Sequence, residues 1–491
     1  MNNLVYDVES KPTGWKLFVF SFQQVMAVLA ATITVPILIG LSGHISAAIL
    51  GCGIGTITYI LFTRKKSPVI LSSSFAYISA LTIAYAKYGF LGIIIGSTLA
   101  GLVYVIIALI IKKFGTGWLE KLLPPIIIGP VVALIGLTLA PSAIANLVSA
   151  NGYVTSTGAH PYNLVAILCG ITAFIVVIIC TTQNKSKNIQ LLPFLVGIGC
   201  GYVLAAIFTL IGSLANVPYL MVIDFSPIVN NFKEVSFASF LNYPRVALIE
   251  GIKEIADGNS KINGIAVLEL ALAFMPIALV SFSEHVADHK NLSSIIGRDL
   301  VNEEPGLSNT LLGDGIGSIT GTIFGICPNT TYGESIACVA ITKNASIRTT
   351  MLAALMCIVL SFISPIIVTL QSIPSCVMGG VCLVLYGFIS VSGLRMISGL
   401  DISGGKNLFT LSVILICGIG GLALQIPYQF GLIDEASNLY GVVKFIEVGA
   451  IAFALIMGII TYNLVGAIEK RNQKAEPEQK AQEEAPQEQA E

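Results

Sequence analysis

Four carboxyl side chains lie in or beside segments that are otherwise apolar: Glu284, Asp288, Asp314 and Glu334. Ionisable groups are costly inside a membrane, so their default reading is functional. Burial favours the protonated form of a carboxyl, and Glu284 follows the apolar run Phe274–Phe282. Glu284 is therefore a candidate to carry a proton. Ionised carboxylates also accept hydrogen bonds from the N–H groups of a ligand.

Two neighbours of Glu284 have different expected roles. Asp288 follows four residues later and shares its helical face, which predicts two carboxyls that titrate as a unit. The alternative is that Asp288 is solvated at the cytoplasmic interface. His285 points about 100° away from Glu284 on a helix, which favours a structural role. Asp314 fits a packing residue as well as a site residue.

Polar clusters begin two short apolar segments, Ser72-Ser73-Ser74 and Pro328-Asn329-Thr330-Thr331. Short, broken helices that face each other near the membrane midplane are typical of transporter sites. Non-helical backbone is tolerated at that depth only where it is buried or lines a cavity. The pattern predicts backbone N–H groups that are free to bind a substrate carbonyl.

The composition excludes a soluble protein. Of 491 residues, 55% are hydrophobic and 11% are charged, against about 25% charged in soluble domains. Runs long enough to cross a bilayer predict an all-α polytopic membrane protein with about fourteen spans. The expected spans are Trp15–Leu41, Ala47–Phe62, Val69–Tyr85, Leu91–Ile111, Leu123–Leu147, Leu164–Cys180, Leu191–Leu214, Ile265–Phe282, Leu307–Phe324, Thr330–Ile341, Met351–Leu370, Val377–Val391, Leu408–Leu424 and Val442–Val465.

The basic residues predict the orientation. Most of the 26 Lys and Arg fall on one side of the spans, and that side is cytoplasmic by the positive-inside rule. Both termini, including residues 1–14, are then cytoplasmic, and residues 467–491 form a disordered cytoplasmic tail. The ten cysteines lie in or beside apolar spans and indicate no disulfide framework. No nucleophile and base pair or metal-ligand cluster indicates an enzyme.

The longest connection, residues 215–264, separates seven expected spans from seven. An odd number per half forces an inverted repeat, which is common among secondary transporters. Weak internal similarity supports two halves, because Ser74-Phe75-Ala76 matches Thr331-Tyr332-Gly333. The short third and tenth spans are the expected broken ones.

Three strings of residues carry a resemblance to a known family, and the last of them, Asn329 to Glu334, is highly specific. Ser283-Glu284-His285-Val286, then Gly313-Asp314-Gly315, then Asn329-Thr330-Thr331-Tyr332-Gly333-Glu334 resemble the nucleobase–ascorbate transporter family, also called nucleobase:cation symporter-2, and within it the bacterial uracil permeases. The resemblance runs from about Ser21 to Val465. It implies a core domain of residues 15–112 and 265–371 and a gate domain of residues 113–214 and 372–466.

The resemblance also implies site residues. Glu284 and Glu334 are similar to the family's substrate-binding carboxylates, and Phe75 and Gly333 to the positions whose N–H groups meet nucleobase carbonyls; Tyr332 and Tyr386 match neighbouring pocket residues. Uracil fits such a site, because it has two N–H donors and two carbonyl acceptors.

Two positions depart from the family pattern. Gln24 in the first span and Asp288 in the eighth stand where the family's uracil permeases have histidine. Histidine relays known elsewhere in the family therefore do not transfer to this chain, and its proton route stays open.

The expectation is a uracil:proton symporter of a bacterial inner membrane that works by alternating access. It needs no cofactor beyond the coupling ion, H⁺, and binds no nucleic acid; a homodimer is what the family implies. One alternative is a xanthine or urate permease of the same family, although those usually carry Gln where this chain has Glu334. Another is an anion exchanger or channel, since fold does not fix function.

Overall fold

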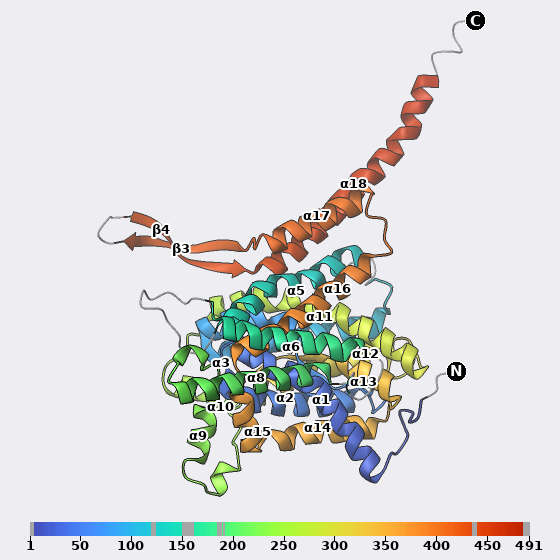
Figure 1. Ribbon diagram of the computed structural model, residues 1–491. Coiled ribbons are helices and arrows are strands. Elements are labelled where there is room, and N and C mark those ends of the chain that lie inside the picture. Colours follow the sequence, from blue (N-terminus) through green and yellow to red (C-terminus); the bar gives the residue numbers. More distant parts are fainter. Residues whose placement is uncertain are drawn as a thin grey trace, which may run out of the picture. The chain divides into compact units, whose positions relative to one another are not determined.

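A computed structural model describes residues 4–118, 124–149, 162–183, 189, 192–434 and 439–484. The chain is mainly helical, as Figure 1 shows. The helices are α1 (Gly14–Leu38), α2 (Ile45–Phe62), α3 (Ile78–Phe114), α5 (Pro125–Val148), α6 (Leu164–Thr182), α8 (Pro193–Ala215), α9 (Ser226–Phe232), α10 (Ala247–Ala256), α11 (Gly264–Ile296), α12 (Gly306–Ile323), α13 (Gly333–Thr342), α14 (Ile347–Ser361), α15 (Ser364–Gln371), α16 (Ser375–Ile397), α17 (Gly405–Ile419) and α18 (Ala450–Glu484). The strands are β1 (Leu71–Ser73), β2 (Asn329–Thr331), β3 (Leu424–Asp434) and β4 (Leu439–Val448).

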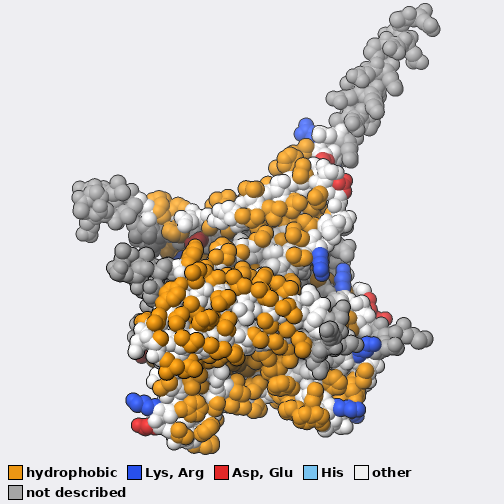
Figure 2. Space-filling model, viewed as in Figure 1, with side chains coloured by type: hydrophobic (Ala, Val, Ile, Leu, Met, Phe, Trp, Pro, Cys, Tyr) orange, Lys and Arg blue, Asp and Glu red, His pale blue; other side chains and the backbone are white. Residues whose placement is uncertain are grey.

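Within the described residues, nine helical segments are long and apolar enough to cross a membrane, so the protein is a multi-pass membrane protein. The counts of fourteen spans and of seven per half stay predictions. One reason for the lower number is α3, where two expected spans run on as one helix across a kink at Gly89 (φ 64°). Apolar side chains also cover the outer face over α6 and α8, as Figure 2 shows.

Contacts divide the chain into two compact units. One comprises Met1–Gly115 and Leu139–Gly387, and the other comprises Thr116–Thr138 and Phe388–Glu491. In the second unit, α17 packs against α18, and β3 pairs with β4 in an antiparallel hairpin. All predicted site residues belong to the first unit.

The expectation of an all-helical chain needs correction, because the structure contains two antiparallel strand pairs. β1 and β2 replace the starts of the third and tenth expected spans, with Leu71 opposite Thr331 and Ser73 opposite Asn329. Backbone polar groups must be satisfied internally in a membrane. Pairing the two interrupted segments with each other meets that requirement for β1 and β2.

Three further differences concern where segments begin or end. The apolar run predicts that the eighth span ends at Phe282, but α11 continues to Ile296, which places Glu284 and Asp288 inside a helix. The last span is expected to begin at Val442, but the residues up to Val448 belong to strand β4 of the β3–β4 hairpin. Helix α18 extends to Glu484, and the remainder of the predicted tail, residues 485–491, lies outside the described residues.

Helices α2 and α12 cross at very close range because glycines face each other. A Cβ atom on Gly51 would lie 2.2 Å from the Gly321 carbonyl oxygen and 2.9 Å from Gly325 Cα. Small residues at a helix–helix contact let membrane helices approach backbone to backbone. Asn329 of β2 donates from Nδ2 to the Gly51 carbonyl at 2.8 Å, so this crossing also fixes β2.

We expect Gly51→Ala to lower the free energy of unfolding by about 1–3 kcal/mol, because the added methyl overpacks the crossing. A lower midpoint of thermal unfolding in detergent would show it. Gly43→Ala is the matched control, since nothing lies within 4 Å of a Cβ atom on Gly43. Equal melting temperatures for the two variants would contradict the close approach of α2 and α12.

Candidate functional site

Two helical segments begin beside the paired strands. β1 is followed by a 3₁₀ turn, Phe75–Tyr77, that leads into α3, and β2 is followed by α13, which starts at Gly333. The strands stay together at this point, where the Ser74 N–H donates to the Pro328 carbonyl at 3.0 Å. First-turn N–H groups lack intrahelical acceptors, and the N-terminal end of a helix carries partial positive charge. Phe75 and Gly333 thus begin segments suited to a carbonyl or an anionic oxygen.

Helix α11 has two distinct polar faces. Glu284 and Asp288, four residues apart, are half-buried, whereas His285 and His289 on the other face are buried. The two imidazole rings stack with centroids 4.1 Å apart. The faces therefore separate accessible carboxyls from an internal hydrogen-bond network.

That internal network ties α11 to α12 and α2. His285 Nδ1 lies 2.7 Å from Asp314 Oδ2, and His285 Nε2 lies 3.1 Å from the Thr310 hydroxyl. Thr310 donates its hydroxyl proton to the Leu307 carbonyl, so His285 Nε2 must be the donor to Thr310. One further proton is then shared between Asp314 and His285 Nδ1. With one shared proton the pair is neutral as a whole, which suits side chains with 0% and 1% exposure.

His289 is fixed in the same way. Its Nδ1 donates to the His285 carbonyl at 2.8 Å, which leaves Nε2 to accept from the Tyr59 hydroxyl at 2.7 Å. Ser67 lies 2.7 Å from the same Tyr59 oxygen. These contacts give both histidines helix-packing roles, as the sequence favours for His285.

Asp288 faces the paired strands. Its Oδ2 accepts from the Thr331 hydroxyl at 3.0 Å, and its Oδ1 is 3.9 Å from where a Cβ atom on Gly333 would lie. Asp288 is also within electrostatic range of both Glu284 and Glu334. The structure thus places Asp288 against Thr331 and near Gly333 rather than leaving it solvated at the end of the helix.

No basic side chain balances these acids in the described part of the chain. None of the buried residues there is Lys or Arg, and no ion pair among the described residues involves Glu284, Asp288 or Glu334. The same residues contain no cluster of three His, Cys, Asp or Glu side chains suited to a metal ion.

Gln24, which stands in place of a family histidine, secures α13. The Ser335 hydroxyl donates to Gln24 Oε1 at 3.1 Å, and Gln24 Nε2 donates to the Ser335 carbonyl at 3.4 Å. Ser335 Oγ also accepts from the Ile70 N–H at 3.1 Å. Gln24 therefore holds the residue next to Glu334. The sequence marks Gln24 only as a departure from the family, and Thr331 as part of a polar cluster.

Three aromatic side chains lie together beside the helix starts. The Phe75 ring centroid is 6.3 Å from that of Tyr332 and 6.2 Å from that of Tyr386, the latter edge to face at 82°. Tyr332 is in turn within electrostatic range of Glu284 and Glu334. All seven predicted residues therefore belong to one region, which combines acids, helix starts and aromatic rings.

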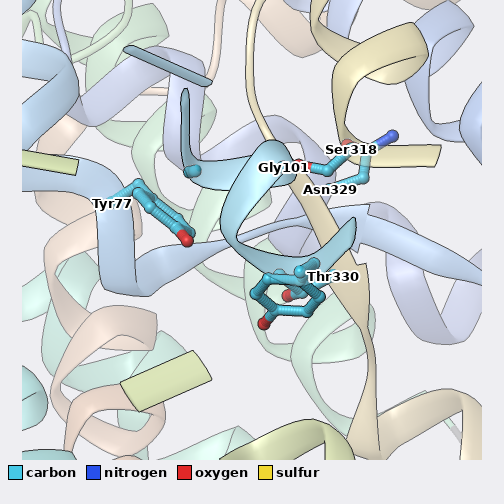
Figure 3. Close-up of a pocket in the computed structure, with 7 residues that line it drawn as sticks. Tyr77, Gly101, Ser318, Asn329 and Thr330 are labelled. Atoms are coloured by element: carbon cyan, nitrogen blue, oxygen red, sulfur yellow. The ribbon is translucent and has the colours of Figure 1, made fainter. Parts of the chain in front are cut away.

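A small cavity lies elsewhere, between α3, α12 and β2. It is lined by Tyr77, Ala100, Gly101, Tyr104, Ser318, Asn329 and Thr330. Figure 3 shows Ser318 and Asn329 on one side of it and Tyr77 on another. None of the seven predicted site residues lines this cavity, so it is distinct from the acidic region.

Comparisons with known proteins show the family of the chain. Residues 15–426 match the model of a family described as the permease family. The uracil permease of Bacillus caldolyticus is 36% identical over 445 residues, which are 90% of this chain and 94% of that protein. The uracil permease of Escherichia coli K12 is 31% identical over 432 residues, 87% of this chain and 90% of that protein.

Solved structures share the fold at low sequence identity. The transmembrane domain of the cyanobacterial bicarbonate transporter BicA matches with a TM-score of 0.55 at 13% identity, covering 92% of this chain and 98% of that one. The murine anion transporter Slc26a9 in its inward-facing state matches with a TM-score of 0.56 at 10% identity, covering 92% of this chain and 68% of that one.

Proposed function

The chain belongs to the nucleobase–ascorbate transporter family of permeases, and from this premise we propose that it is a uracil:proton symporter of a bacterial inner membrane. Its relatives are named permeases, not enzymes. Both termini are cytoplasmic in this proposal, and the chain acts as a homodimer.

The observation that carries the proposal is the set of half-buried acids beside two helix starts, without a basic partner in the described residues. Uracil presents two N–H donors and two carbonyl acceptors on a flat ring. Glu284 and Glu334 accept from the N–H groups, and the N–H groups of Phe75 and Gly333 donate to the carbonyls. Phe75, Tyr332 and Tyr386 pack against the ring.

Proton coupling follows from the same acids. Glu284 and Asp288 share a helical face, and two carboxyls that close do not both ionise readily. Glu284 holds the coupling proton while uracil is bound and releases it on the cytoplasmic side. Movement of the core segments against the gate segments then alternates access to the site.

Two rival functions are disfavoured by particular residues. A xanthine or urate permease of this family usually carries Gln at the position of Glu334. An anion exchanger would need a cation in the site, and the buried residues of the described chain include no Lys or Arg, so the likeness to two anion transporters reflects fold alone.

Uptake of labelled uracil in a permease-deficient bacterium tests the proposal directly. We expect accumulation that a protonophore abolishes and that excess unlabelled uracil suppresses far better than excess xanthine. Accumulation that persists with the protonophore but requires sodium would overturn proton coupling. Stronger competition by xanthine would overturn the substrate.

Asp288→Asn should shift the alkaline limb of the uracil-uptake profile toward acid by roughly one to two pH units. The change removes a negative neighbour, so Glu284 loses its proton at lower pH. The Asn side chain keeps an oxygen that accepts from Thr331, so β2 stays in place. The measurement is initial uptake rate against external pH.

Asp299→Asn, in the loop after α11, is the control and should leave the profile unchanged. An Asp288→Asn variant with the wild-type midpoint would show that Asp288 holds Thr331 without taking part in proton coupling.

A further inference from the structure

Helix α10, in the long connection before α11, has its polar side turned toward the protein. Ala247, Glu250 and Gly251 are buried, whereas Leu248, Ile249, Ile252 and Ile255 are 38%, 50%, 55% and 58% exposed. A surface helix of a soluble protein shows the opposite arrangement, with its apolar stripe against the core. The apolar face of α10 therefore points outward and its polar face inward, as in a helix whose outer surroundings are apolar.

The inward acids of α10 have partners within the protein. Glu250 accepts from Arg245 Nε at 3.0 Å and from Arg245 Nη2 at 3.1 Å, and Lys253 lies 3.3 Å from it. Glu254 accepts from the Phe90 and Leu91 N–H groups at 2.9 and 3.2 Å. Those two N–H groups begin the helix that restarts after the Gly89 kink. Glu254 thus fixes α10 to α3, and the isoleucines of α10 face outward.

The outer face of α10 continues an apolar surface of α3. On α3, Leu102, Ile106 and Leu109 are exposed, at the spacing of one helical stripe. Toward the kink that stripe reaches Leu91, whose side chain lies 3.0 Å from where a Cβ atom on Gly251 would be. Helix α10 therefore covers the Leu91 end of the α3 stripe, and the isoleucines of α10 are exposed there instead.

The apolar stripe of α3 is about as long as the hydrocarbon core of a bilayer is thick. Leu91 and Leu109 are separated by eighteen helical steps, or about 27 Å, close to the roughly 30 Å of a hydrocarbon core. Lys112 and Lys113 follow Leu109 at the opposite end. The end of the stripe that α10 covers is therefore about one hydrocarbon thickness away from Lys112 and Lys113.

The flanking side chains suit that depth. Arg245 and Lys253 bind Glu250 while their side chains remain 58% and 59% exposed, and long basic side chains reach headgroups from an apolar helix. In the same connection Phe237 and Tyr243 are 82% and 74% exposed. Aromatic residues gather at membrane interfaces.

We infer that α10 is an interfacial membrane helix whose Leu248, Ile249, Ile252 and Ile255 insert into the lipid at the boundary between acyl chains and headgroups. Its inward Glu254 holds the kinked end of α3, the helix that leads back to Phe75. The lipid contact is thus made by a helix that is hydrogen-bonded to α3, and the turn that precedes α3 contains Phe75.

Tryptophan fluorescence in lipid tests this placement without reference to any substrate. The chain has two tryptophans, Trp15 and Trp118, which are first replaced by phenylalanine. Ile252→Trp is then compared with Lys261→Trp, an exposed polar position of the same connection. The full chain is reconstituted in phosphatidylcholine and phosphatidylglycerol nanodiscs with and without brominated acyl chains.

We expect brominated lipid to quench Ile252→Trp at least twofold more than Lys261→Trp, and aqueous iodide to do the reverse. Ile249→Trp repeats the test on the same face if Ile252→Trp folds poorly. Iodide quenching of both α10 variants would place the helix in water and overturn the inference. Protection from both quenchers, with cross-linking between chains, would instead place a second copy on this face and overturn it too.

Discussion

Glu284→Gln should abolish uphill accumulation of uracil while exchange across the membrane survives. Glutamine resembles the permanently protonated carboxyl, so it can occupy the site with substrate but cannot release a proton. A gradient of one pH unit is worth about 1.4 kcal/mol per proton, or roughly tenfold accumulation. In the variant that ratio should fall to about one, whereas counterflow of labelled uracil continues.

Proteoliposomes with an imposed pH gradient provide the measurement, and Glu303→Gln, an exposed acid before α12, provides the control. Because α11 continues well past Glu284 and is fixed by the His285–Asp314 pair on its other face, the substitution should leave the helix in place. Wild-type accumulation by Glu284→Gln would move the coupling proton to Asp288 or Glu334. Loss of both activities would show a binding role alone.

Apolar runs predict several helices closely, because hydrophobic length is a direct consequence of bilayer thickness. The expected span Leu164–Cys180 is observed as α6, Leu164–Thr182. The same signal fails on α11, where Glu284, His285 and Asp288 end the apolar run but not the helix. Polar side chains that have hydrogen-bond partners inside the protein are compatible with a membrane helix. Hydropathy depends on residue type alone and contains no information about those partners.

Sequence patterns do not predict strands β1 and β2, for a related reason. β1 and β2 have three residues each, too few for an alternating pattern, and their pairing joins segments about 260 positions apart, as Leu71 and Thr331 show. The polar clusters predict interrupted helices, but not the partner of each interruption. The same limit applies to Gln24 and Ser335, whose contact depends on tertiary packing.

The sequence predicts which residues are candidates for the site better than it predicts how their side chains are arranged. The spacing of Glu284 and Asp288 places both on one helical face, and the structure has them there. The contact of Asp288 with Thr331 decides that this carboxyl faces the strands, and no spacing rule contains that information. The role of each acid in transport stays a prediction for the variants proposed above.

Glu334→Gln should weaken uracil binding by roughly tenfold or more, because a hydrogen bond to a charged group is worth about 1.5–3 kcal/mol. A carboxylate accepts at both oxygens, whereas the amide presents an N–H₂ group that cannot accept from a uracil N–H. Glu334 lies in the first turn of α13, and the adjacent Ser335 is held by Gln24. The loss should therefore come from the changed donor and acceptor pattern, not from movement of the helix.

Calorimetric titration of purified protein with uracil measures the loss, and Glu234→Gln, an exposed acid in the connection before α10, is the control. A thermal unfolding midpoint equal to wild type in the absence of uracil would separate lost binding from lost folding. The helix start at Gly333 remains in the variant, so residual binding through the carbonyls should persist at higher uracil concentrations. Unchanged affinity would remove Glu334 from the set of groups that touch the substrate, and the purine alternative would regain weight, because the residue would then no longer discriminate between ligands.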